Sequence, residues 1–260
     1  MRFMHIDCSM GAAGDMLSAA LLELLPVNER DGFVDSFNAL GIPGVCMEAE
    51  PSVKCGVSGT HIHIKVHGVE EGHTHGHDEH GHDHDAHDHE HRGMAEIENI
   101  VNGLNGLSEK VRDDVMNVYK IIADAESKAH GVPVSEVHFH EVGAMDAIAD
   151  ISAVCMLMDR IGAERVTATP VNVGGGTVKC AHGILPVPAP ATALILEGVP
   201  YYSGDIKSEL CTPTGAALLK YFVDEFGEMP LMTIGSEGFG MGTKDFEKAN
   251  CVRITLGIAE

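Results

Sequence analysis

Two periodicities in the apolar residues predict most of the elements of this chain. Apolar residues at helical spacing predict helices at residues 15–25, 30–40, 94–104, 108–130, 144–160, 191–197 and 213–226. Short apolar or alternating runs predict strands at residues 2–7, 45–53, 60–66, 165–171 and 251–256. Helices and strands alternate along much of the chain. This pattern is typical of an α/β or α+β fold in which helices flank a mixed sheet.

The composition of residues 69–93 breaks this pattern. Residues 61–91 hold twelve of the seventeen histidines, and residues 70–90 contain eight Asp or Glu but no Lys or Arg. Because this stretch has almost no apolar side chains, it cannot form a core, and we predict a disordered His-rich linker. The linker would join an N-terminal lobe at residues 1–68 to a larger lobe at residues 94–260.

The chemistry of this predicted linker is that of a metal-binding segment. Imidazoles interleaved with carboxylates bind borderline divalent cations such as nickel, zinc, cobalt and copper. The candidate ligands are His73, His75, His77, His80, His82, His84, His87, His89 and His91. The alternative is a solvated spacer that binds metal only weakly.

The overall charge narrows the possible partners. The chain has 17 Lys and Arg against 39 Asp and Glu, a formal net charge of -22. This balance disfavours nucleic acid and anionic membrane surfaces and favours cations. The seven cysteines are odd in number and far apart, which favours a reducing cytoplasm, and no CxxC pair suggests a zinc knuckle or a redox motif. No apolar run is long enough to span a membrane.

Residues 138–150 carry the strongest signal for chemistry. If this segment begins as a strand, its two histidines point to one face, which provides half of a metal site. A helix should follow, with two aspartates four residues apart on one face. The candidate ligands or acid–base groups are His138, His140, Glu141 and Asp146, with Asp150 beyond them. The alternative is a strand-to-helix corner whose polar groups are simply satisfied.

A small-residue loop follows the first predicted strand. Gly11, Gly14 and Asp15 lie where the loop enters a helix, whose free N–H groups could cradle an anion. The spacing matches neither the P-loop nor the dinucleotide fingerprint. A tight turn between strand and helix explains these residues equally well.

A second glycine-rich stretch begins with Gly174, Gly175 and Gly176. Three successive glycines allow another group to approach the backbone closely. Lys179, Cys180 and His182 follow within reach, and together they could bind a metal, a phosphate or a thiolated ligand. A glycine-rich hairpin with an ordinary surface lysine and histidine is the alternative.

The last part of the chain carries two further signals. Thr212 is a helix N-cap followed by proline, and this helix start, with Thr214 as an extra donor, could hold a phosphate. Capping alone explains it about as well. The glycines at positions 235, 238, 240 and 242 predict a flexible loop.

Taken in order, these motifs resemble the LarC family of nickel insertion proteins. The resemblance rests on DCSMGAAGDM, the His-rich linker, HFHEVGAMDAIADI, GGGTVKCAHGILPVPAPAT, ELCTPTGAALL and GFGMGTKDF. It implies a cytoplasmic nickel chelatase, classed as a lyase, that uses CTP. Its substrate would be pyridinium-3,5-bisthiocarboxylic acid mononucleotide, the precursor of the nickel-pincer cofactor of lactate racemase.

The resemblance also implies partners that this chain lacks. Family members continue past Leu256 into a C-terminal portion that handles CTP, with Mg²⁺ or Mn²⁺, and oligomerisation. We therefore expect a homo-oligomer, that C-terminal portion as a partner, and lactate racemase or another enzyme as acceptor of the product.

Residue chemistry and the family reaction together suggest roles for the candidate residues. His138, His140, Glu141 and Asp146 would hold nickel beside the substrate, with Glu141 the first candidate for the base. Lys179 and the helix start at Thr212 would bind the substrate phosphate. The rival hypothesis is a nickel storage or delivery protein without chemistry of its own.

Overall fold

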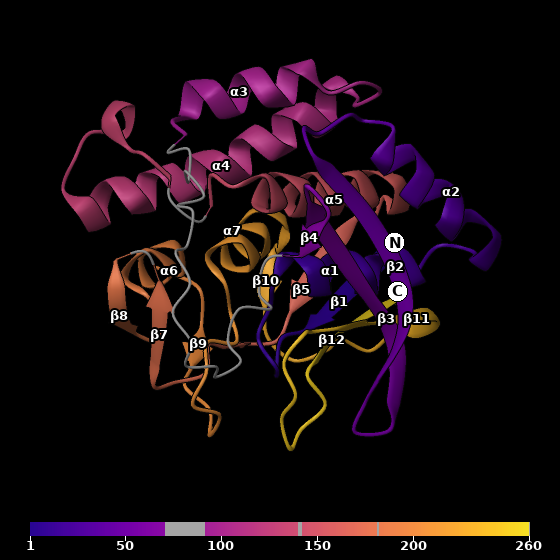
Figure 1. Cartoon of the computed structure of the whole chain (residues 1–260). Helices are drawn as coiled ribbons and strands as arrows, with labels where there is room; N and C mark the ends of the chain where they lie inside the picture. The colour runs from indigo at the N-terminus through magenta and orange to yellow at the C-terminus, as the bar shows by residue number, and fades with distance from the viewer. Residues whose placement is uncertain (71–91, 140–141, 181, 260) are drawn as a thin grey trace, which may run out of the picture.

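The computed structural model describes residues 1–70, 92–139, 142–180 and 182–259. All nine histidines proposed as linker ligands lie outside these residues, as do His140 and Glu141. The described part is an α/β fold with one large mixed sheet and helices packed on it, as predicted (Figure 1). No helix within it is long and apolar enough to cross a membrane.

The large sheet has eight strands in the order β10-β5-β1-β12-β11-β3-β2, and β4 pairs with β3. The strands are β1 Arg2–Asp7, β2 Val45–Lys54, β3 Val57–Val66, β4 Val69–Glu70, β5 Arg165–Ala168, β10 Glu225–Phe226, β11 Thr233–Met241 and β12 Cys251–Ile258. β1 runs parallel to β5 and antiparallel to β12. The four short strands β6 Val171–Asn172, β7 Thr177–Cys180, β8 Gly183–Pro186 and β9 Tyr201–Tyr202 form two separate pairs.

This topology joins the two expected lobes in one sheet. β1, β2 and β3 come from the region before the predicted linker, whereas β5, β10, β11 and β12 come from the region after it. Strand β12 lies between β1 and β11 and pairs with both. The two regions therefore share one sheet and one hydrophobic core.

The helices are α1 Gly14–Glu23, α2 Val27–Asn38, α3 Met94–Gly103, α4 Glu109–His130, α5 Met145–Ile161, α6 Pro190–Ile195 and α7 Pro213–Phe222, with a 3-10 turn at Val134–Glu136. Helices α3, α4 and α5 lie one above another over the sheet, whereas α2 lies beside β2 and α6 beside β8 (Figure 1). α1 packs on β11, β3 and β12, and α5 packs on α1. α4 lies over α5, α6 and α7, and α3 lies outermost on α4.

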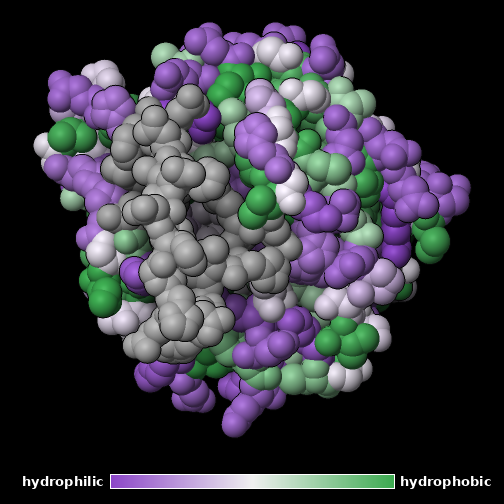
Figure 2. All heavy atoms as spheres, in the orientation of Figure 1, coloured by the Kyte–Doolittle hydropathy of each residue, from purple (hydrophilic) through white to green (hydrophobic). Residues whose placement is uncertain are grey.

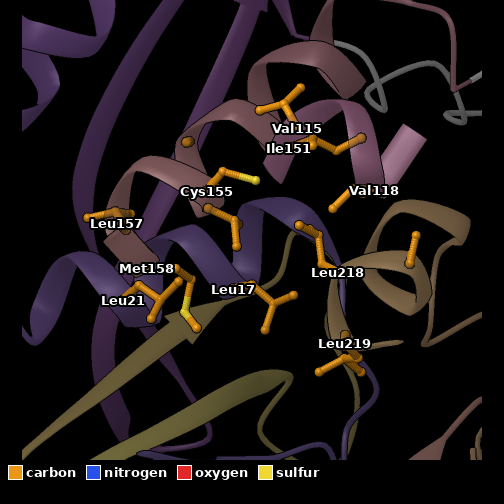
Figure 3. Packing of buried hydrophobic residues seen from close by; sticks show 14 of the residues in the cluster. Leu17, Leu21, Val115, Val118, Ile151, Cys155, Leu157, Met158, Leu218 and Leu219 are labelled. Carbon is orange, nitrogen blue, oxygen red and sulfur yellow. The ribbon is translucent and has the colours of Figure 1, made fainter. Parts of the chain in front are cut away.

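The core forms where four of these helices meet. Leu17 and Leu21 of α1, Val115 and Val118 of α4, Ile151 and Cys155 of α5, and Leu218 of α7 pack together (Figure 3). All of them are almost fully buried. Hydrophilic side chains cover much of the described surface on the face drawn in Figure 2. Burial of this apolar surface is the main force that holds the layers together.

Two helices begin at side-chain caps, and the one expected at Thr212 is confirmed. The Ser108 side chain accepts a hydrogen bond from the Val111 N–H at the start of α4, which ends at Gly131 in the left-handed conformation. Thr212 caps α7 in the same way, with Pro213 as the first helical residue. Each of the two caps accepts a hydrogen bond from a backbone N–H group that the first turn of a helix leaves unpaired.

Three predictions about local structure were wrong. Residues 233–241 form strand β11 rather than a flexible loop, because their glycines allow α1 to lie directly on the sheet. The described residues 137–139 form no strand, and Phe139 makes an isolated bridge with Arg92, whereas residues 140 and 141 lie outside the described residues. α7 ends at Phe222 instead of residue 226, because β10 then pairs with β5.

Candidate functional site

Four segments meet beyond the carboxyl ends of the parallel strands β1 and β5: residues 8–15, 142–150, 172–176 and 209–215. We call them the loop cluster. The Asn172 N–H donates to the Cys8 carbonyl at 3.1 Å, and the Ala12 N–H donates to the Leu210 carbonyl at 3.0 Å. The edge where parallel strands end is a common place for ligands in α/β proteins. The structure therefore gathers most of the motifs singled out in the sequence at one edge.

The glycines of these motifs allow close approach between protein segments. A Cβ atom on Gly11 would lie 1.9 Å from the Leu210 carbonyl oxygen, and one on Gly174 would lie 1.9 Å from the Ser208 carbonyl oxygen. Both have positive φ angles, of 84° and 80°. Gly175 and Gly176 likewise face the segment at residues 203–207. These glycines therefore have a structural role, whatever ligand binds near them.

Three carboxylates lie together where α1 and α5 begin. Asp150 accepts a hydrogen bond from the Asp15 N–H, and its Cβ fits against Gly14. Burial raises the pKa of Asp150 well above its usual range, and the Asp15 and Asp146 carboxylates raise it further. The Oδ1 atom of Asp150 is buried without a hydrogen-bond partner among the described residues. A proton or a cation at this carboxyl group would relieve the excess of negative charge.

This arrangement bears on the predicted anion cradle at Gly11, Gly14 and Asp15. The amide at the start of α1 that was expected to face an external anion donates instead to the Asp150 side chain. The Gly11 N–H donates to the Cys8 carbonyl within the turn. Both N–H groups are therefore hydrogen-bonded to other residues of the protein.

The segment before α5 is fixed by two anchors. The Phe139 ring is buried 6.0 Å from the ring of Tyr119, and the Tyr119 hydroxyl donates to the Val142 carbonyl. Arg92 donates to the Gly143 carbonyl at 2.9 Å. His138 is exposed next to buried Phe139, which matches the predicted alternation of faces. These contacts anchor the described residues on either side of residues 140 and 141.

The start of α7 closes the loop cluster from the other side. The Thr212 hydroxyl accepts from the Gly215 N–H at 3.1 Å and lies 3.0 Å from the Thr214 hydroxyl. The Thr212 N–H donates to the Ala12 carbonyl, which also lies against Gly215. The threonine pair and the N-terminal loop therefore sit directly beside each other, as a phosphate site built from both would require.

The stretch after Gly176 forms a hairpin of β7 and β8. Lys179 is exposed on β7, Cys180 is half-buried, and His182 is exposed at the turn. The ring centroid of His182 lies 4.8 Å from that of His130, at the end of α4. The stretch is thus a hairpin, as one of the two interpretations expected, and it brings a thiol and an imidazole close to the end of α4.

A cavity of about 190 Å³ lies between this hairpin, the end of α4 and the first residues of α6 and α7. Cys180, His182, His130, Glu126 and Glu209 contribute its polar groups. Sequence reasoning missed His130, Glu126 and Glu209, although Glu126 and His130 are four residues apart in α4 and the Glu126 Oε2 lies 3.2 Å from the His130 Nε2. That helical spacing was the signal available in the sequence. The cavity adjoins the loop cluster through Val142 and Pro213.

Only two of the four proposed nickel ligands lie among the residues that the structure describes. Within residues 1–70, 92–139, 142–180 and 182–259, no three His, Cys, Asp or Glu side chains are arranged to hold a metal ion. Two of the four proposed nickel ligands fall outside that part of the chain. Of the other two, His138 precedes the unplaced pair and Asp146 follows it within the first turn of α5.

The fold and the site define an α/β protein with a small cavity beside clustered carboxylates and imidazoles. The model of a family described as "Nickel insertion protein" matches residues 4–260. The chain belongs to this family, the LarC family of nickel insertion proteins. No solved structure matches the chain.

Curated relatives carry the same description. The chain is 40% identical over 262 residues to the pyridinium-3,5-bisthiocarboxylic acid mononucleotide nickel insertion protein of Clostridium kluyveri, covering 100% of this chain and 63% of the relative. It is 38% identical to that of Desulfitobacterium hafniense, covering 99% and 58%, and 36% identical to that of Geobacillus kaustophilus, covering 99% and 60%. The chain thus spans about three fifths of the length of these relatives.

Proposed function

We propose that this chain forms part of an enzyme that inserts nickel into pyridinium-3,5-bisthiocarboxylic acid mononucleotide. The observation that carries the proposal is the loop cluster, where motifs spread from residue 8 to residue 215 meet at one sheet edge. The names of the relatives supply the reaction, and the cavity next to the loop cluster offers room for an organic ligand.

The nickel ion is a substrate in this reaction. His138, His140, Glu141 and Asp146 are proposed to hold it, since two imidazoles and two carboxylates suit a borderline divalent cation. Forming a carbon–nickel bond on an aromatic ring releases the proton of that carbon. Glu141 is proposed as its acceptor, with Asp146 supporting the same step.

The phosphate of the mononucleotide requires donors near the same place. Thr212 and Thr214 lie at the positive end of α7, where their hydroxyl groups and the helix dipole would stabilise a phosphate. Lys179 is proposed to add a positive charge from the exposed face of β7. The glycine-rich turns at residues 11–14 and 174–176 would shape the site around it.

The remaining requirements are assigned to the rest of the longer protein. We propose that CTP, with Mg²⁺ or Mn²⁺, binds to the portion that the relatives have beyond this chain, and that a homo-oligomer forms through it. The product would pass to lactate racemase or another acceptor in the cytoplasm. The reaction would then belong to the lyases.

Reconstitution tests this function directly. The chain is incubated with nickel, CTP, Mg²⁺ or Mn²⁺ and the thiolated mononucleotide, with and without the remaining portion of a relative such as that of Clostridium kluyveri. We expect mass spectrometry to detect the metallated product when that portion is supplied. Failure of every combination, alongside an active full-length relative, would contradict the proposal.

Deleting residues 73–91 separates insertion from storage. The deletion removes nine histidines, so equilibrium dialysis should show that most of the bound nickel is lost. An insertase supplied with excess nickel should keep its turnover, because its reaction site lies elsewhere. A storage or delivery protein should lose nearly all function, and that outcome would favour the rival hypothesis.

A further inference from the structure

The proposed substrate is an anion, and the chain that binds it is strongly acidic. The mononucleotide carries two thiocarboxylates and a phosphate against one positive ring, so its net charge at neutral pH is negative. The chain has a formal net charge of -22, which repels such a ligand unless positive groups lie close to the site. Lysines without a carboxylate partner therefore indicate where the substrate can bind.

Most lysines of the chain already have partners. Ion pairs with carboxylates are formed by Lys54, Lys65, Lys110, Lys128 and Lys248. Lys120 and Lys220 donate to uncharged oxygens. Among the residues that the structure describes, the lysines without an ion pair to a carboxylate are then Lys179, Lys207 and Lys244, all of them exposed. We call these three the lysine cluster.

The lysine cluster surrounds the glycine-rich turn of the loop cluster. The Lys207 Nζ lies 3.5 Å from the position that a Cβ atom on Gly175 would take. The Lys244 Nζ donates to the Ser208 Oγ at 3.0 Å, and the Ser208 carbonyl accepts from the Gly175 N–H at 3.2 Å. Lys179 follows the same turn on β7. The segments after β9 and after β11, which carry Lys207 and Lys244, project from the lower side of the molecule in Figure 1.

The acidic residues next to Lys207 and Lys244 are paired with other lysines. The Asp245 Oδ1 accepts from the Lys54 Nζ at 2.6 Å. The Asp205 Oδ2 lies 3.9 Å from the Lys248 Nζ. An ammonium group has three donors, and Lys244 uses one of them on a neutral hydroxyl. Both lysines therefore keep donors and positive charge for a ligand.

We propose that Lys207 and Lys244, together with Lys179, bind the anionic groups of the mononucleotide. The inference rests on the proposed function for the identity of the substrate, and it adds two binding residues to the site. The group bound is a phosphate or a thiocarboxylate, both of which accept hydrogen bonds from ammonium groups. Lys244 belongs to the motif GFGMGTKDF, for which the proposed function gave no role.

Calorimetric titration with nicotinic acid mononucleotide, a stable pyridinium carboxylate with a phosphate, tests this proposal. Lys207→Gln and Lys244→Gln should each weaken binding about fivefold, the upper range for an exposed ion pair. Lys120→Gln, which removes an exposed lysine of α4, should leave the Kd unchanged. Lys207→Arg should keep most of the affinity, because it keeps the charge. At about 0.5 M salt the difference between the variants should largely disappear.

Two further probes identify the group that each lysine binds. Nicotinamide mononucleotide keeps the phosphate but has a neutral amide, whereas nicotinic acid riboside keeps the carboxylate but has no phosphate. A lysine that binds the phosphate should affect only the first of these probes, and one that binds the carboxylate only the second. Either pattern supports the proposal. Equal affinity of the unmodified chain and both glutamine variants for every probe, or no binding of any probe, would overturn it.

Failure of this inference can be told apart from failure of the proposed function. The titrations need neither nickel nor CTP, so they do not depend on insertion. If the glutamine variants bind the probes as tightly as the unmodified chain, the lysine site is wrong even when reconstitution yields product. If reconstitution fails but these variants lose affinity, the lysine site stands and the reaction assignment falls.

Discussion

Replacing His138 and His140 together by alanine is expected to abolish nickel insertion in the reconstituted assay. The two imidazoles are proposed to hold the metal beside the substrate. Losing a single supporting partner of a metal ligand commonly costs about 10- to 100-fold, so losing two ligands should cost at least about 100-fold. Initial rates of product formation, followed by mass at several nickel concentrations, measure the effect.

A matched double variant controls for the removal of histidine itself. His87→Ala, His89→Ala removes an equally spaced pair from the His-rich segment and should keep its turnover with excess nickel. His138 is exposed, so its loss should not unfold the chain, and circular dichroism of both proteins checks this. Unchanged turnover in the His138, His140 variant would remove this pair from the site.

The Gly240→Ala variant is expected to be destabilised by about 3 kcal/mol, because overpacking at a helix–sheet contact has no simple relief. A Cβ atom at Gly240 would lie 1.8 Å from the Met16 carbonyl oxygen and 2.7 Å from the Ala20 nitrogen. Both are backbone atoms of α1, so the helix would have to move off the sheet. Urea unfolding followed by circular dichroism at neutral pH measures the change.

Gly32→Ala is the control for this glycine substitution. Gly32 is exposed in the middle of α2, and nothing lies within 4 Å of the added Cβ. Alanine is the better helix former there, so the variant should be stabilised by about 0.5 to 1 kcal/mol. Equal stability of the Gly240→Ala variant and the unmodified chain would contradict the close packing of α1 on β11.

The same glycines explain why the sequence misled at β11. Glycine weakens the strand pattern of residues 233–241, because it has no β-branched side chain and is depleted in strands. What makes it favourable is the backbone of α1 on the same face of the sheet, more than 200 residues earlier in the chain. Long-range packing of this kind leaves no local pattern to read.

Other elements could be predicted because their cause is local. The cap at Thr212 depends on residues within one turn, and it was placed correctly. The closeness of Asp146 and Asp150 follows from helical spacing alone. The cavity, in contrast, depends on the end of α4 meeting a hairpin some 50 residues later. The sequence could indicate Cys180 and His182 as candidates for a site, but it could not show that the end of α4 lies beside them.

The position of β12 constrains how this protein is made. Its residues 251–258 fill the place between β1 and β11, so the sheet cannot close around β1 until these residues have been synthesised. Until then β1 lacks its antiparallel neighbour and leaves backbone donors and acceptors exposed. Such distant pairing makes folding slow. A chain truncated before residue 251 would lack the strand that joins β1 to β11, and we expect it to be insoluble on expression.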